Sequence, residues 1–128
     1  MRRLDWWRRE EGTASVEAVL WLPLFFLTLG IVTDVTMIFH GYTQALRVMQ
    51  DANRSLSIGR IETTAEAETF IEAALAPLSG AAAATSSTEG GIVTTVVTLP
   101  AADLQILGVL SQFNTLTLTL QAQHMVEA

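Results

Sequence analysis

The stretch EEGTASVEAVLWLPLFFLTLGIV, residues 10–32, decides the architecture of this chain of 128 residues. It leads into an apolar run from Ala18 to Phe39, in which Asp34 is the only ionisable residue. The run is about as long as the roughly 20 residues that cross a bilayer. The sequence therefore predicts a single transmembrane helix, which we place at residues 13–39.

Charge is distributed unequally around this run. Four of the seven arginines lie before it, and the chain has no lysine. The positive-inside rule therefore predicts a cytoplasmic N-terminus and a periplasmic C-terminus, with the leader arginines near anionic lipid headgroups. The net charge is −6, which disfavours nucleic acid as a partner. Because the chain lacks cysteine, disulfides, thiolate metal sites and a cysteine nucleophile are excluded.

The helical pattern continues beyond the membrane run. Residues of one stripe recur at alternating intervals of four and three, with alanines beside them: Tyr42, Leu46, Met49, Asn53 and Leu56, next to Ala45 and Ala52. This periodicity predicts an amphipathic extension at residues 40–60, so that one helix of about 65 Å covers roughly Thr13 to Ser57. Gly59 closes it, and Pro23 predicts a kink in its first half because proline cannot donate a backbone hydrogen bond.

Residues 61–128 predict a small periplasmic α+β domain. Thr63 and Glu66 have the spacing of a helix capping box, and the second helix that they open ends near Pro77 and Gly80. Its expected buried face consists of Phe70, Ile71, Ala74, Leu75 and Leu78. The glutamates on this helix, Glu66, Glu68 and Glu72, are expected to face solvent.

A small antiparallel sheet of two to three strands is expected after this helix. The β-branched run IVTTVVTLP, residues 92–100, predicts a strand, and the turn TEGG joins it to a weaker strand around Ala82 to Ser87. The run NTLTLTLQAQHMV, residues 114–126, alternates strictly and predicts a third strand. Its inward face carries Leu116, Leu118, Leu120 and Ala122, and His124 is expected to lie half buried on the same side. The predicted fold class is thus α+β, with a long N-terminal helix.

No catalytic residue, metal site or cofactor is predicted. His40 and His124 stand far apart in the sequence, and neither has metal-binding spacing with another ligand; His40 follows the apolar run and is expected at the membrane interface. No nucleophile elbow or phosphate loop is found, so no small-molecule substrate is predicted. Asn53 begins a glycosylation sequon, but it lies within the predicted helix, and we interpret the match as coincidence.

The opening stretch resembles the leader of type IV prepilins, in which a peptidase cuts after a glycine and a glutamate follows five residues later. Gly12 and Glu17 have this spacing. The segment is more specifically similar to the TadE-like minor pilins (pseudopilins) of tight-adherence (Tad) pilus systems, whose pattern is matched by Gly12, Val16, Glu17, Leu22, Pro23, Gly30, Ile31 and Val32. The acid expected directly after Gly-Ile-Val comes one residue later here, at Asp34.

The resemblance implies roles for a few residues. Gly12 would precede the cut made by a prepilin peptidase, so that residues 1–12 are a cytoplasmic leader and Thr13 becomes the new N-terminus. Glu17 would serve subunit assembly by pairing with the ammonium of Thr13, in its own or a neighbouring subunit. The expected partners are this peptidase, other pilins, pilus assembly proteins and membrane lipid. The expected location is the bacterial inner membrane or a surface pilus that serves cell adhesion.

Two other classes of function remain open at this point. The chain could be an uncleaved single-pass membrane protein whose periplasmic domain serves pilus assembly or another binding role, and its mass would then include residues 1–12. A membrane-tethered enzyme would need His40 or His124 to meet carboxylates in a cleft. The leading interpretation is a minor pilin that acts by helix packing and has no catalysis of its own.

Overall fold

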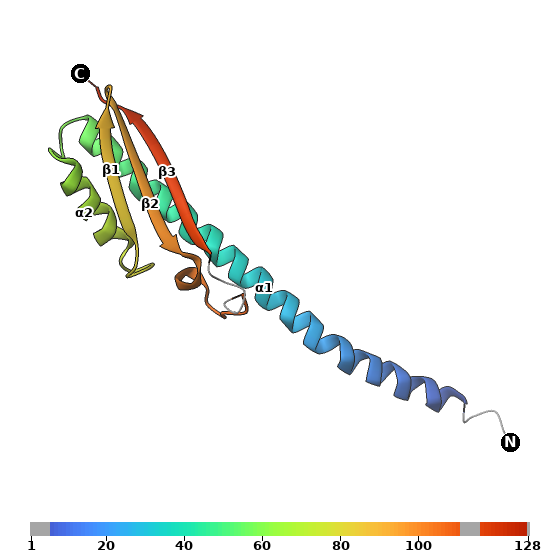
Figure 1. Ribbon diagram of the computed structural model, residues 1–128. Coiled ribbons are helices and arrows are strands. Elements are labelled where there is room, and N and C mark those ends of the chain that lie inside the picture. Colours follow the sequence, from blue (N-terminus) through green and yellow to red (C-terminus); the bar gives the residue numbers. More distant parts are fainter. Residues whose placement is uncertain (1–5, 111–115, 128) are drawn as a thin grey trace.

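One long helix dominates the structure. The computed structural model describes residues 6–110 and 116–127, and its first element, α1, covers Trp6–Ser57, about 78 Å at 1.5 Å per residue. Figure 1 shows α1 projecting far beyond the rest of the molecule. The predicted end at Ser57 is confirmed, but the predicted start at Thr13 is wrong by about two turns. A glycine inside a helix costs only about 1 kcal/mol, so Gly12 does not interrupt α1.

The C-terminus of α1 is closed by Gly59, as predicted. Its φ of 74° is the left-handed conformation that glycine adopts without a β-carbon penalty. The amide of Gly59 donates to the carbonyl of Leu56 at 3.2 Å, and the amide of Arg60 donates to the carbonyl of Ser55 at 2.8 Å. These bonds satisfy carbonyls that the last turn of a helix leaves without partners.

The second helix, α2, covers Thr64–Leu75. The Thr63 hydroxyl accepts the Glu66 amide at 3.2 Å, which confirms the predicted cap, although the Glu66 carboxylate reaches back to the amide of Glu62 rather than to that of Thr63. The predicted buried face is partly wrong. Its buried residues are Ala67, Ile71 and Leu75, whereas Phe70 is 47% exposed and Ala74 is exposed. A helix lying beside the edge of a sheet buries a narrower stripe than one lying across it.

Three antiparallel strands complete the fold in the order β1-β2-β3: β1 Ala83–Glu89, β2 Ile92–Pro100 and β3 Thr117–Met125. The predicted hairpin is confirmed, with Glu89 opposite Ile92. Gly90 and Gly91 form its turn with φ of 58° and 80°, the pair of left-handed residues that a type I′ turn requires. The α+β class predicted from the sequence is thereby confirmed.

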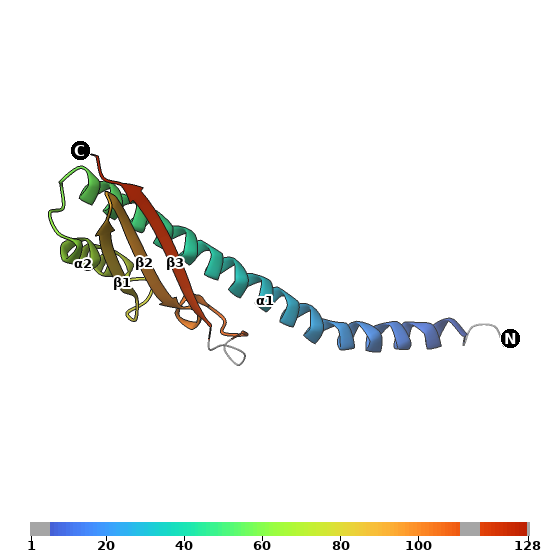
Figure 2. The ribbon, with the colours of Figure 1, turned by 45° about the horizontal axis from the view of Figure 1, so that its top comes forward.

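The C-terminal half of α1 packs against β2 and β3, and α2 packs against β1 (Figures 1 and 2). The core joins residues of α1, α2 and all three strands: Ala45, Met49, Ala52, Ile71, Leu75, Ala84, Val97, Leu99 and Leu120. The buried stripe of α1 is centred on alanines, with Tyr42 exposed and Leu46 half buried, because small residues let the helix approach the sheet closely. The expectation of a half-buried His124 is wrong: it is exposed, since α1 ends soon after Asn53, the residue that contacts Ala122.

Candidate functional site

The residues of the predicted processing site lie on the isolated part of α1. Gly12, Thr13 and Glu17 are all exposed, and a β-carbon built on Gly12 would meet no atom within 4 Å. Thr13 and Glu17 are four residues apart on one helix, so their side chains share a face. Among the described residues, the Glu17 carboxylate has no hydrogen-bond or ion-pair partner. The predicted roles of these three residues stay predictions.

The apolar segment of α1 has almost no protein around it. Within the described residues, α1 is the one helix that is long and apolar enough to cross a membrane. Only 6% of its most apolar 18-residue stretch is buried. Its large side chains face outward, among them Leu20, Trp21, Phe25 and Phe26. This arrangement fits a single-pass membrane protein, because such a surface needs lipid or other helices to cover it.

Pro23 lies inside this segment, and α1 is assigned as one α-helix through it. Figure 2 shows that the axis of α1 bends within its blue N-terminal half. Further along, threonine hydroxyls donate back to carbonyls one turn earlier, as Thr28 does to Leu24 at 2.9 Å and Thr33 to Leu29 at 2.8 Å. A kink caused by Pro23 itself stays a prediction.

Asp34 attaches the sheet domain to this helix. Its side chain is fully buried, and its two carboxylate oxygens accept the backbone amides of Leu107 at 2.9 Å and Val109 at 2.7 Å. The sequence pattern assigned no role to Asp34. Its one signal was that it is the single acid in an apolar run, where a carboxylate needs partners.

Two glycines let the segment after β2 approach α1. The segment begins with the 3-10 helix η1, Ala101–Leu104. A β-carbon on Gly41 would lie 2.7 Å from the Cδ2 of Leu104, and one on Gly30 would lie 2.9 Å from the Cγ2 of Val109. Since both glycines share α1 with Asp34, they and the carboxylate together fix how residues 101–110 lie along the helix.

A second polar connection lies inside the core. The Asn53 side chain is 1% exposed; its Oδ1 accepts the Thr95 hydroxyl at 2.5 Å, and its Nδ2 donates to the carbonyl of Ala122 at 3.3 Å. The Ser86 and Thr95 hydroxyls are 2.9 Å apart, so Asn53 connects α1 with all three strands. A buried amide with these partners is not accessible to a glycosyltransferase.

The edge of the sheet at β1 is covered by α2. The carboxylate of Glu72 accepts the amide of Ala84 at 3.1 Å, and that of Glu68 accepts the amide of Ser86 at 2.6 Å. The expectation that Glu68 and Glu72 are simply solvated is therefore wrong. The two carboxylates accept hydrogen bonds from outward-facing amides of β1. Without such acceptors, the free amides of an edge strand can pair with a strand of another chain.

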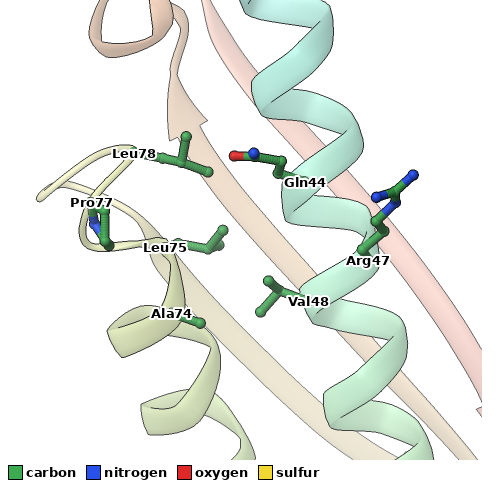
Figure 3. Close-up of a pocket in the computed structure, with 7 residues that line it drawn as sticks. All are labelled: Gln44, Arg47, Val48, Ala74, Leu75, Pro77 and Leu78. Carbon is green, nitrogen blue, oxygen red and sulfur yellow. The ribbon is translucent and has the colours of Figure 1, made fainter.

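A groove of about 350 Å³ lies between α1 and the end of α2. Figure 3 shows Val48 of α1 and Leu75 of α2 pointing toward each other across it, while Arg47 points away from α2. Its walls are mainly apolar: Gln44, Arg47, Val48, Ala74, Leu75, Pro77 and Leu78. Arg47 is the only ionisable residue among these.

The two histidines do not come together in a site. His40 is exposed and its Nε2 lies 3.0 Å from the Nε2 of Gln44, whereas His124 lies on β3 near the hairpin, opposite Val93. Among the described residues, no three side chains of His, Cys, Asp or Glu gather as metal ligands would. The described geometry thus offers helix packing and domain attachment rather than an array of reactive groups.

Comparison with known proteins gives one match. The family model described as TadE-like protein matches residues 12–54, about a third of the chain, which confirms the predicted resemblance over that segment. No curated protein and no solved structure matches the chain. The match covers the exposed apolar helix, Asp34 and the stripe up to Asn53, and it associates the chain with Tad pilus systems, whose other components are the partners that such a family suggests.

Proposed function

Starting from the match of residues 12–54 to TadE-like proteins, we propose that this chain is a minor pilin or pseudopilin, a structural subunit in the assembly of a Tad pilus. The observation that supports the proposal best is the shape of the molecule. A long apolar helix projects from a small sheet domain and has no cover of its own. A subunit of this shape can pass from lipid into a bundle of similar helices, because both environments cover the same apolar surface.

The proposed organisation has four parts. Residues 1–12 are a cytoplasmic leader, residues 13–39 span the inner membrane, residues 40–60 extend the helix, and residues 61–128 form the periplasmic domain. A prepilin peptidase cuts between Gly12 and Thr13. Since α1 is helical on both sides of that bond, the peptidase has to unwind a turn, and Gly12 keeps this inexpensive because glycine is a poor helix former.

Cleavage would give Glu17 a partner. The new ammonium of Thr13 would lie one helical turn from the carboxylate, which otherwise enters the membrane region without a partner among the described residues. A carboxylate near lipid is costly unless it is paired, and the positive end of the helix adds about 0.3–1 kcal/mol of stabilisation. The same carboxylate could instead meet the ammonium of a neighbouring subunit during assembly.

Substitution of Glu17 tests this role. Glu17→Ala should insert into the membrane and be cleaved normally, yet enter the pilus or its assembly complex poorly, as measured by immunoblotting of sheared pili and membranes. Glu89→Ala, which removes an exposed carboxylate at the hairpin, is the matched control. Wild-type amounts of Glu17→Ala in the pilus fraction would remove the pairing hypothesis.

The N-terminal sequence of the protein from its native membrane distinguishes cleavage from the alternative. A processed subunit begins at Thr13, and it begins at Met1 in cells that lack the peptidase. An uncleaved single-pass protein with a periplasmic interaction domain begins at Met1 in both strains. That second result would overturn the processing claim and leave a structural role in pilus assembly to be tested by deletion.

A further inference from the structure

The segment that follows η1 lies along the part of α1 expected inside the membrane. Asp34 and Gly30, which contact the loop, precede Phe39, the end of the apolar run, by five and nine residues. At 1.5 Å per residue they lie about 7.5 and 13.5 Å from that end. If α1 spans a bilayer, the loop of residues 105–110 is therefore carried below the expected membrane surface.

The outward side of this loop is apolar. Ile106 is 64% exposed and Leu107 is 58% exposed, although the loop backbone is held against a buried carboxylate. The loop has no charged residue. Two large aliphatic side chains on a short loop would be left in water if this region lay outside the membrane. Both lie beside α1: the Cδ1 of Leu107 would be 3.8 Å from a β-carbon built on Gly30, and Ile106 lines one groove with Met37 and His40.

Backbone that is not helical is tolerated at membrane depth only where its polar groups have partners in the protein. Asp34 provides such partners, because its two oxygens accept the amides of Leu107 and Val109. The benefit is mutual, since a carboxylate at this depth also needs hydrogen-bond donors. The pairing lowers both costs, that of placing these two loop amides in hydrocarbon and that of placing this acid there.

We propose that residues 105–110 enter the membrane leaflet nearest the sheet domain, where Ile106 and Leu107 contact lipid acyl chains and Asp34 holds the loop on α1. The inference rests on the proposed membrane-spanning role of α1. Lipid is favoured over a protein partner because the exposed apolar side chains of the loop lie beside the span at the same depth. The sheet domain is thereby seated on the membrane in a fixed position instead of being free at the end of a helix.

The absence of native cysteine permits a direct depth measurement. The full chain is reconstituted at low density in vesicles of phosphatidylcholine and phosphatidylglycerol, with the environment-sensitive dye NBD on one of three single-cysteine variants: Leu107→Cys, Leu24→Cys or Thr88→Cys. Lipids carrying a doxyl quencher at shallow or deep positions report the depth of each dye. Thr88 is exposed on β1 near the hairpin and serves as the water-exposed control.

The dye at position 107 should emit at shorter wavelength than the dye at position 88 and lose more emission to shallow than to deep quenchers. Emission at 107 that matches 88, while the dye at 24 is quenched, would overturn the loop inference and leave the spanning helix intact. An unquenched dye at 24 would instead refute the spanning role itself. A blue shift at 107 that arises only as protein density rises, without lipid quenching, would assign the surface to a neighbouring chain and also overturn the inference.

Asp34→Ala in the Leu107→Cys chain tests the attachment. Without the carboxylate, quenching at 107 should fall and lose its dependence on quencher depth. Leu24→Cys with Asp34→Ala controls for insertion, because the dye at 24 should be quenched as before. Unchanged quenching at both positions would show that the loop stays in the membrane without Asp34 and would refute its role as the anchor.

Discussion

Replacing Asn53 by alanine removes the side chain that joins α1 to the sheet. The alanine cannot accept the hydroxyl of Thr95 or donate to the carbonyl of Ala122, and Thr95 is fully buried. A hydrogen bond contributes about 0.5–1.5 kcal/mol net, and a buried polar group without a partner costs about 1–3 kcal/mol. The Thr95 hydroxyl keeps the Ser86 hydroxyl, 2.9 Å away, as a partner, so the loss of the two Asn53 bonds dominates and we expect the free energy of unfolding to fall by about 1–3 kcal/mol.

The assay is urea unfolding of the full chain in detergent micelles, followed by circular dichroism and by hydrogen exchange of the β2 and β3 amides. Gln50→Ala, at an exposed position of the same helix, is the control and should change stability by no more than about 0.5 kcal/mol. In a Thr95→Val background the hydroxyl that donates to Asn53 is already absent. Asn53→Ala should therefore lower the free energy of unfolding by at least about 1 kcal/mol less in that background than in the wild-type chain. The reasoning is refuted if Asn53→Ala unfolds like the control, or if its cost is the same in both backgrounds.

Three further substitutions test local features of the fold. Glu72→Ala should speed hydrogen exchange at the amide of Ala84, which loses its acceptor; unchanged exchange would mean that α2 does not protect the edge. Gly91→Val should lower stability to urea by about 1–2 kcal/mol, because valine is strained at a left-handed φ of 80°; a neutral effect would contradict the assigned turn. Gly41→Val should cost about 1–3 kcal/mol through overpacking against Leu104 and should speed exchange in residues 101–110, and the absence of both effects would show that η1 does not rest on α1.

Much of the secondary structure was predictable because its causes are local. The end of α1 near Gly59, the Thr63 cap and the turn at Gly90 and Gly91 each depend on residues within a few positions of one another. The prediction was less accurate where packing decides. Phe70 has the right spacing for a buried face, but α2 lies beside the sheet edge and leaves it exposed.

The predicted site residues divide in the same way. The spacing of Gly12 and Glu17 is a sequence pattern, and the match of residues 12–54 supports the family that it indicated. The importance of Asp34 was not predictable, because its partners Leu107 and Val109 follow it by 73 and 75 residues. Asn53 was placed correctly on the inward stripe of α1, yet nothing in its neighbourhood indicated a partner 42 residues away.

The sequence by itself determined that this protein has one long apolar helix followed by a small α+β domain. Hydrophobic periodicity, the length of apolar runs and turn residues all depend on residues close together in the sequence, so the sequence alone reveals them. Only the tertiary structure decided which polar groups meet. Burial makes a polar group without a partner costly. Asp34 and Asn53 are buried, so each had to find donors or acceptors where the folded chain brings distant backbone and side chains together, and in Asp34 this requirement holds the sheet domain against the helix.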